Sequence, residues 1–490
     1  MLGWMSGSHG YNAHEAIKEF TEETLKQLIV VSNRVPSPDK DSGSQGGLAV
    51  GVMNALSRTQ GLWMGWNGQL VEDAEQHAPQ SYENEGVQFA TFPLTEQEHE
   101  LFYVGYSNEV LWPLFHYRSD MVEYSREKDA GYQHVNERFA RQVAGQITKD
   151  SDASIWVHDY QLLSTGHYLR LMDVECPIGF FLHIPVPPWE VFRILPHHAR
   201  MIEHLCAYDT IGFQTATDLR HFLENVERSG VATVEGNTVI YDRRRINTGV
   251  FPISIDVDTA REMAEKGEQS SRSHRLKESL QGGPLIIGVD RLDYSKGLYK
   301  RFQAFEQLLE NTHTRYGNVT YLQIAPLSRT GVERYASLRR ELERIAGHVN
   351  GRFSTYDWMP LRYLNTGYDR ETLMGFMRQS RVGLVTPLRD GMNLVAKEYV
   401  AAQDPEDPGV LLLSNLAGAA EELDGAMLCN PFDVEEMADM LDAALSMSLE
   451  ERKERWQRLH KVISTYDIHR WGESFVTALD QSAAARHADK

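Results

Sequence analysis

The segment LVTPLRDGMNLVAKE, residues 384–398, combines residue types and spacing that could do chemistry, because two carboxylates, Asp390 and Glu398, stand eight residues apart in it. An apolar run leads into a charged glycine turn, and a helix-forming run follows. The carboxyl end of a strand that turns into a helix leaves backbone N–H groups free to bind an anion. The pattern therefore predicts an anion over the amides of residues 392–395. In the alternative interpretation, Asp390 merely caps the helix and Glu398 is an exposed helix residue.

Polar and charged side chains also follow other apolar runs of the chain. They are Arg34 after 28–33, Asp159 within 153–160, His183 within 177–184, Arg291 within 284–292, Lys296 after it, and Arg329 after 319–326. One such residue alone is more often structural. Three arginines and a lysine in a chain of net charge −20 predict a local basic pocket for phosphate. The glycine-rich run 41–51 is either a loop that approaches phosphate closely or a flexible loop.

The elements that must position these side chains alternate along the chain. Apolar runs at 28–33, 153–160, 177–184 and 210–215 precede helix-like segments, and after a connector at 250–259 the pattern resumes with runs at 284–292, 319–326, 382–388, 409–415 and 426–431. Continuous apolar strands are typical of parallel sheets with both faces covered. The sequence predicts two doubly wound α/β halves that face each other across a ligand-binding cleft.

Length, charge and cysteine content limit the classes of function. A chain of 490 residues predicts two domains, and a net charge of −20 argues against nucleic acid or an anionic membrane as partner. The sequence shows neither a membrane-length apolar run nor a signal peptide, so we expect a cytoplasmic protein. The widely spaced Cys176, Cys206 and Cys429 are expected to be buried, reduced thiols. No metal or other cofactor is expected, because Arg and Lys side chains are expected to do the work that Mg²⁺ does elsewhere.

Motifs from both halves together identify a family resemblance. SNR, GGLAVG, GLWMGWNG, VLWPLFHYR, WVHDYQLL, FFLHIPVP, DRLDYSKGL, IAPLSR and TPLRDGMNLVAKEYVAAQ resemble, in order and spacing, the α,α-trehalose-phosphate synthases, a retaining glycosyltransferase family. The resemblance spans about residues 28–482. It implies a GT-B fold of two Rossmann-like domains. The expected parts are an extension at 1–26, an acceptor domain at 27–255, a nucleotide-sugar domain at 256–465, a helix crossing back at 466–482 and a tail at 483–490.

On the donor side, the resemblance implies a nucleotide-glucose bound mainly by the second domain. Arg291 and Lys296 would neutralise the leaving diphosphate, Glu398 would accept from the ribose, and Asp390 and His183 would lie beside the glucose. The expected catalytic residues are Arg291, Lys296, Asp390 and His183. The whole expected donor-binding set is Gly47, Arg291, Lys296, Tyr368, Asp390, Gly391, Met392, Asn393, Leu394, Val395 and Glu398.

On the acceptor side, the resemblance implies glucose 6-phosphate bound mainly by the first domain. Arg34, Arg329, Tyr103 and Trp112 match residues around its phosphate and ring, Asp159 matches one that orients its hydroxyls, and Trp66 is expected to shape the pocket. Trp63 and Phe115 are interpreted as core. The family is thought to use front-face attack, in which the leaving phosphate takes the acceptor proton, so no side chain is named as nucleophile.

Some positions depart from the family pattern and leave alternatives open. Pro188 and Trp189 replace small hydroxyl residues of many relatives, and Tyr368 stands where Phe is common near the base. UDP-glucose is the expected donor, with GDP- and ADP-glucose as alternatives. A glucosyltransferase acting on glycerol 3-phosphate is a second interpretation. A non-catalytic regulatory subunit is a third, although such a subunit would be expected to lose Arg291, Lys296 or Glu398. The oligomeric state stays open, with a homo-oligomer among the alternatives.

Overall fold

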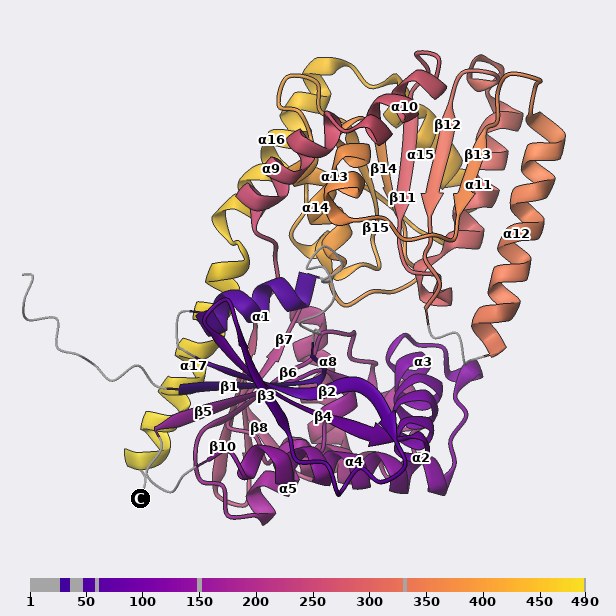
Figure 1. Ribbon diagram of the computed structural model, residues 1–490. Coiled ribbons are helices and arrows are strands. Elements are labelled where there is room, and N and C mark those ends of the chain that lie inside the picture. Colours follow the sequence, from indigo (N-terminus) through magenta and orange to yellow (C-terminus); the bar gives the residue numbers. More distant parts are fainter. Residues whose placement is uncertain (1–26, 36–46, 58–60, 148–151, 329–332, 489–490) are drawn as a thin grey trace, which may run out of the picture.

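The computed structural model describes residues 27–35, 47–57, 61–147, 152–328 and 333–488. They form two lobes, one below the other in Figure 1, each with a sheet that carries helices on both faces. The expected extension at 1–26 lies outside the described residues. The predicted pair of Rossmann-like α/β domains is confirmed by this architecture and by the strand orders that follow.

The N-terminal lobe contains a ten-stranded sheet among the described residues. In spatial order its strands are β3 (Gln80–Asn84), β4 (Val87–Thr95), β2 (Leu62–Val71), β1 (Gln27–Arg34), β5 (Ala153–His158), β6 (Ile178–Phe181), β7 (Thr210–Phe213), β10 (Arg244–Val250), β9 (Thr238–Tyr241) and β8 (Thr233–Glu235). Strands β4 to β10 in this order run parallel, whereas β3, β9 and β8 pair antiparallel. The predicted parallel sheet thus has additional antiparallel strands at both edges.

The C-terminal lobe contains a six-stranded, fully parallel sheet among the described residues. Its order is β13 (Leu361–Leu364), β12 (Thr320–Ile324), β11 (Leu285–Val289), β14 (Val382–Val385), β15 (Val410–Ser414) and β16 (Met427–Cys429). Counted within the lobe, this is the Rossmann order 3-2-1-4-5-6, whose switch point lies between β11 and β14. In the other lobe the corresponding switch point lies between β1 and β5. Ligands bind at such points.

Helices cover both faces of each sheet. The longer ones are α1 (Gly47–Ser57), α4 (Arg126–Ala144), α8 (Ala216–Ser229), α9 (Val257–Glu268), α11 (Leu298–Asn311), α12 (Glu333–Phe353), α15 (Val434–Ser446), α16 (Leu449–Thr465) and α17 (Ile468–Ala488). Shorter ones are α2 (Glu96–Glu98), α3 (Trp112–Phe115), α5 (Thr165–Leu171), α6 (Trp189–Phe192), α7 (His198–Leu205), α10 (Ser271–Ser279), α13 (Arg370–Arg378) and α14 (Leu394–Ala402).

Strand β1 shows why the strands read as unbroken apolar runs. Its alternate residues Ile29 and Val31 pack into one core cluster with α4, while Leu28 and Val30 pack into another with α1 and α17. Side chains of a strand alternate between the faces of a sheet, so burial of both faces demands apolar residues at every position.

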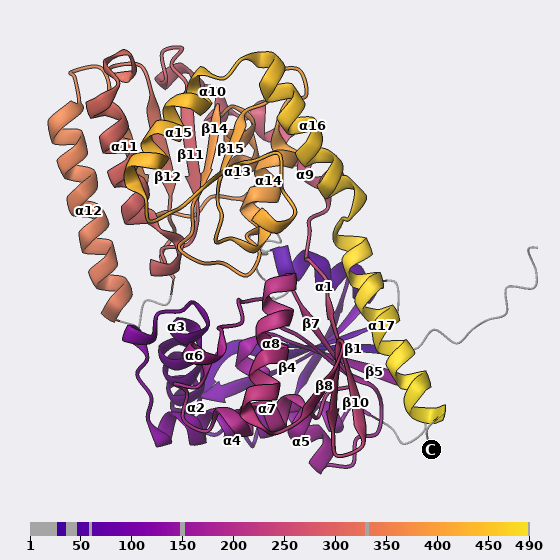
Figure 2. The same ribbon diagram turned by 180° about the vertical axis from the view of Figure 1, so that it is seen from behind.

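Helix α17 leaves the C-terminal lobe and runs along the N-terminal one, as both ribbon views show (Figures 1 and 2). The Phe475 ring stacks on Trp156 with centroids 4.5 Å apart, and Trp471 meets Phe181 at 5.3 Å. The helix continues to Ala488, past the end expected at 482. The domain boundaries drawn from the sequence stay predictions.

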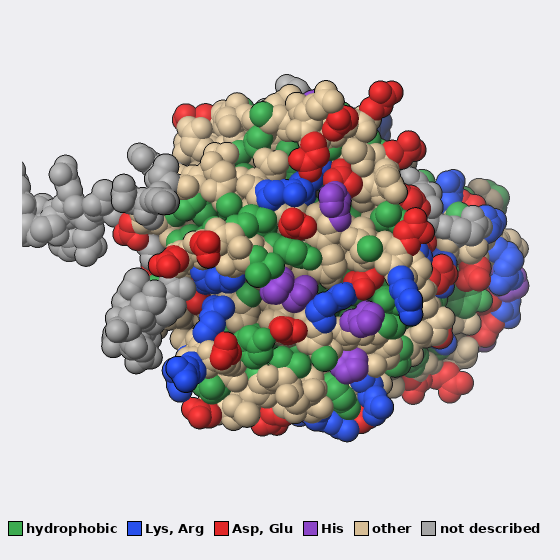
Figure 3. Space-filling view, turned by 90° about the horizontal axis from the view of Figure 1, so that it is seen from below, with side chains coloured by type: hydrophobic (Ala, Val, Ile, Leu, Met, Phe, Trp, Pro, Cys, Tyr) green, Lys and Arg blue, Asp and Glu red, His purple; other side chains and the backbone are tan. Residues whose placement is uncertain are grey.

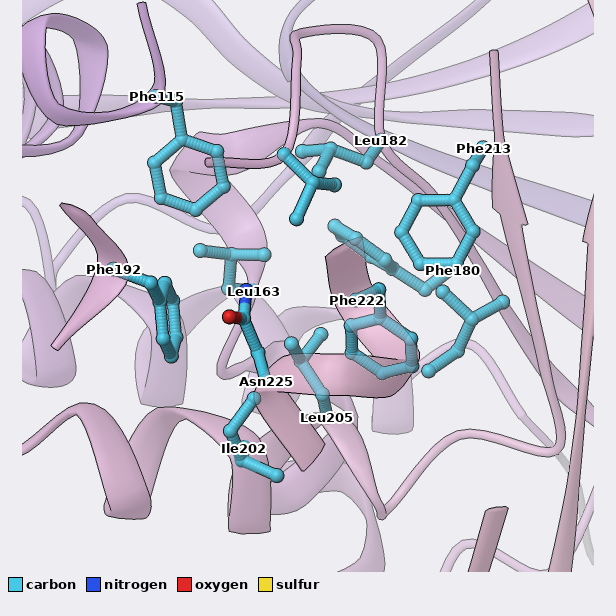
Figure 4. Close-up of a pocket in the computed structure, with 12 residues that line it drawn as sticks. Phe115, Leu163, Phe180, Leu182, Phe192, Ile202, Leu205, Phe213, Phe222 and Asn225 are labelled. Atoms are coloured by element: carbon cyan, nitrogen blue, oxygen red, sulfur yellow. The ribbon is translucent and has the colours of Figure 1, made fainter. Parts of the chain in front are cut away.

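A small cavity of about 20 Å³ lies in the N-terminal core between β6, β7 and helices α7 and α8 (Figure 4). Phenylalanine and aliphatic side chains form its wall, and Asn225 is the polar residue among them. The volume is about that of one water molecule, so a sugar cannot enter.

Acidic and basic side chains lie interspersed on the lower face of the N-terminal lobe (Figure 3). Among the described helices, none has the length and apolar character needed to cross a membrane. Cys206 and Cys429 are buried, and burial raises the pKa of each thiol to about 12. Cys176 is half-buried, a correction to the expected burial of all three cysteines, because it lies in the turn before β6 rather than in a strand.

Candidate active site

The loop between β14 and α14 is built around Asp390. Asn393, with φ +84°, caps α14, and its side-chain oxygen accepts a hydrogen bond from the N–H of Ala396. The amide nitrogen of Asn393 donates to Asp390 at 3.0 Å. The interpretation of Asp390 as a simple helix cap is therefore wrong, because Asn393 does the capping. The N–H groups of Leu394 and Val395, at the start of the helix, have no helical acceptor.

Lys296 forms a close ion pair with Asp390. It ends a short 3-10 turn (Tyr294–Lys296) after β11, and its ammonium lies 2.5 Å from the carboxylate across the switch point. Burial alone would raise the pKa of Asp390, but the charge of Lys296 and hydrogen bonds from Lys296 and Asn393 outweigh it and lower this pKa. Arg291, which follows the same strand, is exposed. The two cations predicted for this edge thus occupy it.

Glu398 lies on α14 and pairs with a residue that the sequence analysis missed. The Arg370 guanidinium donates to its carboxylate at 3.0 Å. Burial raises the pKa of Glu398, and the charge and hydrogen bond of Arg370 oppose this shift. Tyr368 lies two residues before Arg370. Its ring is half-buried, and the Arg272 guanidinium lies 6.0 Å from the ring centroid. Arg370 begins α13, and no sequence signal distinguished it from other helix-start arginines.

In the N-terminal lobe, an aromatic group surrounds Arg34 at the end of β1. The Arg34 guanidinium lies 5.1 Å from the Trp66 ring centroid, and Trp66 is 6.2 Å from Tyr103. Tyr103 belongs to a 13-residue π-helix, η2 (His99–Leu111), which stacks His99 on Tyr103 at 5.3 Å. Long π-helices are rare and are frequent at functional sites. The structure therefore assembles three of the predicted acceptor-side residues.

The remaining acceptor-side predictions have different surroundings. Trp112 is buried beside His116, with ring centroids 4.0 Å apart. Asp159 follows β5 with φ +74°, and its carboxylate accepts from the backbone N–H of His183 at 3.2 Å. Arg329 lies outside the described residues. Gly47 is the first residue of α1 and is described, whereas residues 41–46 of the glycine-rich run lie outside the described residues. Trp63 and Phe115 are buried, as their interpretation as core requires.

The two lobes touch where these loops meet. A Cβ on Gly391 would lie 2.1 Å from the carbonyl oxygen of His183, so only glycine allows this approach. Arg389 lies 4.0 Å from the ring centroid of Tyr117, which itself has φ +61°. Burial lowers the pKa of His116 to about 4, and the negative charges of Asp293 and Asp390 in the other lobe oppose this shift. His116, Tyr117 and Arg389 are site residues that sequence reasoning missed.

The comparisons with known proteins agree with this geometry. The model of glycosyltransferase family 20 matches residues 26–481. The chain belongs to this family. It is 46% identical over 456 residues to a trehalose-6-phosphate synthase of Sodalis glossinidius, a match covering 93% of this chain and 96% of that one. It is 45% identical over 462 residues to the trehalose-6-phosphate synthase of Sinorhizobium fredii, covering 94% and 99%.

Solved structures of family members share the fold. An α,α-trehalose-phosphate synthase (UDP-forming) from Burkholderia vietnamiensis superposes with a TM-score of 0.91 at 47% identity, over 94% of this chain and 98% of that one. The Escherichia coli enzyme bound with UDP-2-fluoro glucose gives 0.88 at 44% identity, over 93% and 99%. A Burkholderia xenovorans synthase in complex with glucose-6-phosphate gives 0.88 at 43%, over 93% and 100%. The predicted resemblance and the GT-B fold are thereby confirmed.

Proposed function

We propose that this glycosyltransferase moves glucose from UDP-glucose to glucose 6-phosphate with retention of configuration, which yields α,α-trehalose 6-phosphate and UDP. The observation that carries the proposal is the pairing of two polar sites at the meeting edges of the lobes. The Lys296–Asp390 pair and the free start of α14 form one, and the Arg34, Trp66 and Tyr103 group forms the other. Relatives that share this fold hold a UDP-sugar in one structure and glucose-6-phosphate in another.

In the C-terminal lobe, the donor diphosphate would lie over the first amides of α14. Arg291, exposed just after β11, and Lys296 would neutralise the charge that grows on UDP as the bond to the glucose anomeric carbon breaks. Lys296 would then divide its charge between Asp390 and the phosphate. Glu398 would accept from the ribose hydroxyls, with Arg370 holding its carboxylate in place. The acceptor oxygen would give its proton to the leaving phosphate.

In the N-terminal lobe, Arg34 would bind the phosphate of the acceptor beside Trp66 and Tyr103, and Asp159 would orient the sugar hydroxyls. The proposed assignment keeps Arg329 as a second phosphate ligand, as the family resemblance implies. The competing interpretation with glycerol 3-phosphate uses the same phosphate ligand, so it differs in the sugar-binding part of the pocket rather than at Arg34.

The proposal is tested by incubating the purified protein with UDP-, GDP- or ADP-glucose and each of three acceptors: glucose 6-phosphate, glucose and glycerol 3-phosphate. Mass spectrometry then identifies the product and proton NMR its anomeric configuration. We expect a phosphorylated disaccharide with two α-anomeric protons from UDP-glucose and glucose 6-phosphate. A product formed from glycerol 3-phosphate alone would overturn the trehalose assignment, and absence of every product would favour a regulatory subunit.

A further inference from the structure

A chain of hydrogen bonds connects the interlobe linker to His183. Gln214 follows β7 and is buried, and its side-chain oxygen accepts from the backbone N–H of Ile253 at 2.9 Å. Ile253 lies in the linker 251–256 between β10 and α9. The side-chain nitrogen of Gln214 lies 3.3 Å from Nδ1 of His183, and Nε2 of His183 lies 3.0 Å from Nδ1 of His158.

The linker residue is held from the opposite lobe as well. Lys397, on α14 and fully buried, donates from Nζ to the Ile253 carbonyl at 2.8 Å and pairs with Glu422 at 2.8 Å. The backbone of Ile253 is therefore fixed by one side chain from each lobe. Its N–H has a fixed direction, and Gln214 must turn its oxygen toward it.

The direction of every hydrogen bond in the chain follows from this fixed amide. An N–H can be accepted only by the Gln214 oxygen, so the NH₂ group of Gln214 faces His183 and donates to Nδ1. Burial lowers the pKa of His183 to about 3, so the ring is neutral near neutral pH. A neutral ring that accepts at Nδ1 carries its proton on Nε2 and donates it to His158. His158 must then carry its own proton on Nε2.

We propose that Gln214 and His158 are positioning residues that hold the His183 imidazole in its Nε2–H tautomer, with Nδ1 kept as an acceptor for a donor-sugar hydroxyl, and that the linker sets this tautomer through Ile253. The proposal rests on the proposed function and deepens it, because the family resemblance implies that His183 lies beside the donor glucose. The contact of His183 with Gln214, at 3.3 Å, is longer than its contact with His158, at 3.0 Å. A sugar hydroxyl that donates to Nδ1 would replace the Gln214 contact without any change of tautomer.

Other groups pack around His183 and frame the test. From β5, Asp159 accepts from its backbone N–H. From the opposite lobe, Gly391 meets its carbonyl, next to Asp390 and its partner Lys296. The rings of Phe181 and Trp471 cover the imidazole, with centroids at 4.6 and 6.1 Å.

The first measurement is the tautomer of His183 in the unaltered enzyme. Long-range proton–nitrogen correlation on ¹⁵N-histidine-labelled protein separates protonated from unprotonated ring nitrogens, and loss of signal in His183→Asn assigns the residue. We expect Nε2 protonated and Nδ1 unprotonated near neutral pH. A proton on Nδ1, or on both nitrogens, would overturn the proposal.

The second measurement uses Gln214→Glu. The new carboxylate still accepts from the Ile253 N–H, so the linker bond stays, but it has no N–H for His183 and adds a negative charge. We expect His183 to become doubly protonated, the acid limb of the pH profile of kcat/KM to move to higher pH, and kcat to fall by ~10- to 100-fold, as when the partner behind a metal-bound histidine is changed. Gln214→Met, which removes both bonds without adding charge, should lower kcat with no shift of the acid limb.

The matched control is Gln403→Glu. Gln403 is also buried, accepts from the N–H of Gly409 and donates to the carbonyls of Met377 and Tyr399, but it lies at the far end of α14. Its change should cost stability while the His183 signals and pH profile stay as in the parent. The proposal would be refuted if the His183 ring signals were unchanged in Gln214→Glu, or if they shifted equally in Gln403→Glu. Failure of the proposed function is distinct, because it removes product while the parent tautomer remains as expected.

Discussion

Replacement of Lys296 by alanine should reveal the energy of the Lys296–Asp390 pair. The two side chains are only 13% and 15% exposed and lie 2.5 Å apart. Removal of one partner from a buried pair leaves an uncompensated charge and typically costs about 3–5 kcal/mol. Because water reaches part of both groups and Asn393 still donates to Asp390, we expect about 3 kcal/mol of unfolding free energy to be lost in Lys296→Ala near neutral pH.

The loss should depend on pH with a defined sign. In the parent the pKa of Asp390 lies below its unfolded value, so its contribution to stability is present above the unfolded pKa and is lost as pH falls through the folded one. In Lys296→Ala, the effect of burial is opposed only by Asn393 and His116, and we expect it to raise the folded pKa of Asp390 above the unfolded value. The variant therefore gains stability from protonation of Asp390, and its deficit against the parent should shrink as the pH falls.

Urea unfolding at a series of pH values measures the free energy of unfolding of the parent and of Lys296→Ala. A steady-state assay at neutral pH should show that turnover of the variant is lower by ~10² or more. The double variant Lys296→Ala/Asp390→Asn should recover most of the stability but none of the turnover. Lys300→Ala, on the nearby helix α11, serves as control. A stability deficit that stays constant across pH would refute the buried-pair argument, and normal turnover would remove Lys296 from the mechanism.

Three further predictions concern other parts of the molecule. Arg34→Ala should raise the KM for glucose 6-phosphate by about 10- to 100-fold, the loss of a charge-assisted hydrogen bond, with little change in donor KM; an equal rise for free glucose would contradict a phosphate contact. Tyr117→Ala and Arg389→Ala should be non-additive by about 0.5–2 kcal/mol in a double-mutant cycle of kcat/KM, and strict additivity would show that their contact is without consequence. Phe222→Ala should enlarge the cavity of Figure 4 and lower the free energy of unfolding by about 3–5 kcal/mol, whereas Leu171→Ala at an exposed site should change it by under about 0.5; similar losses in both would contradict the packing argument.

The central strands could be predicted from sequence because both of their faces are buried. The alternating residues of β1 and β11 contact different core clusters, so each strand appears as an unbroken apolar run. The edge strands β3 and β8 could not be predicted in this way, because they are short and mostly exposed. The π-helix η2 was also missed, since a mixed sequence with no strong helical face gives no periodic signal.

The site was predictable where the chain topology alone places residues at the ends of parallel strands. Lys296 and Asp390 follow β11 and β14, the two strands of the switch point, and they form an ion pair. Arg370 and Tyr117 reach the site from a helix start and from across the cleft, and no spacing in the sequence encodes such contacts. Their partners depend on the relative placement of elements far apart in the chain.

The return of α17 to the N-terminal lobe affects how this lobe folds during synthesis. Trp156 and Phe181 belong to early strands, yet Trp471 and Phe475, which cover them, lie in α17 and are translated only after the whole C-terminal lobe. Helix α1 also packs closely on α17, since a Cβ on Gly51 would lie 2.6 Å from the Ile468 side chain. The nascent N-terminal lobe must therefore fold without the helix that covers these side chains, and a chain cut short before α17 would leave them uncovered and prone to aggregation.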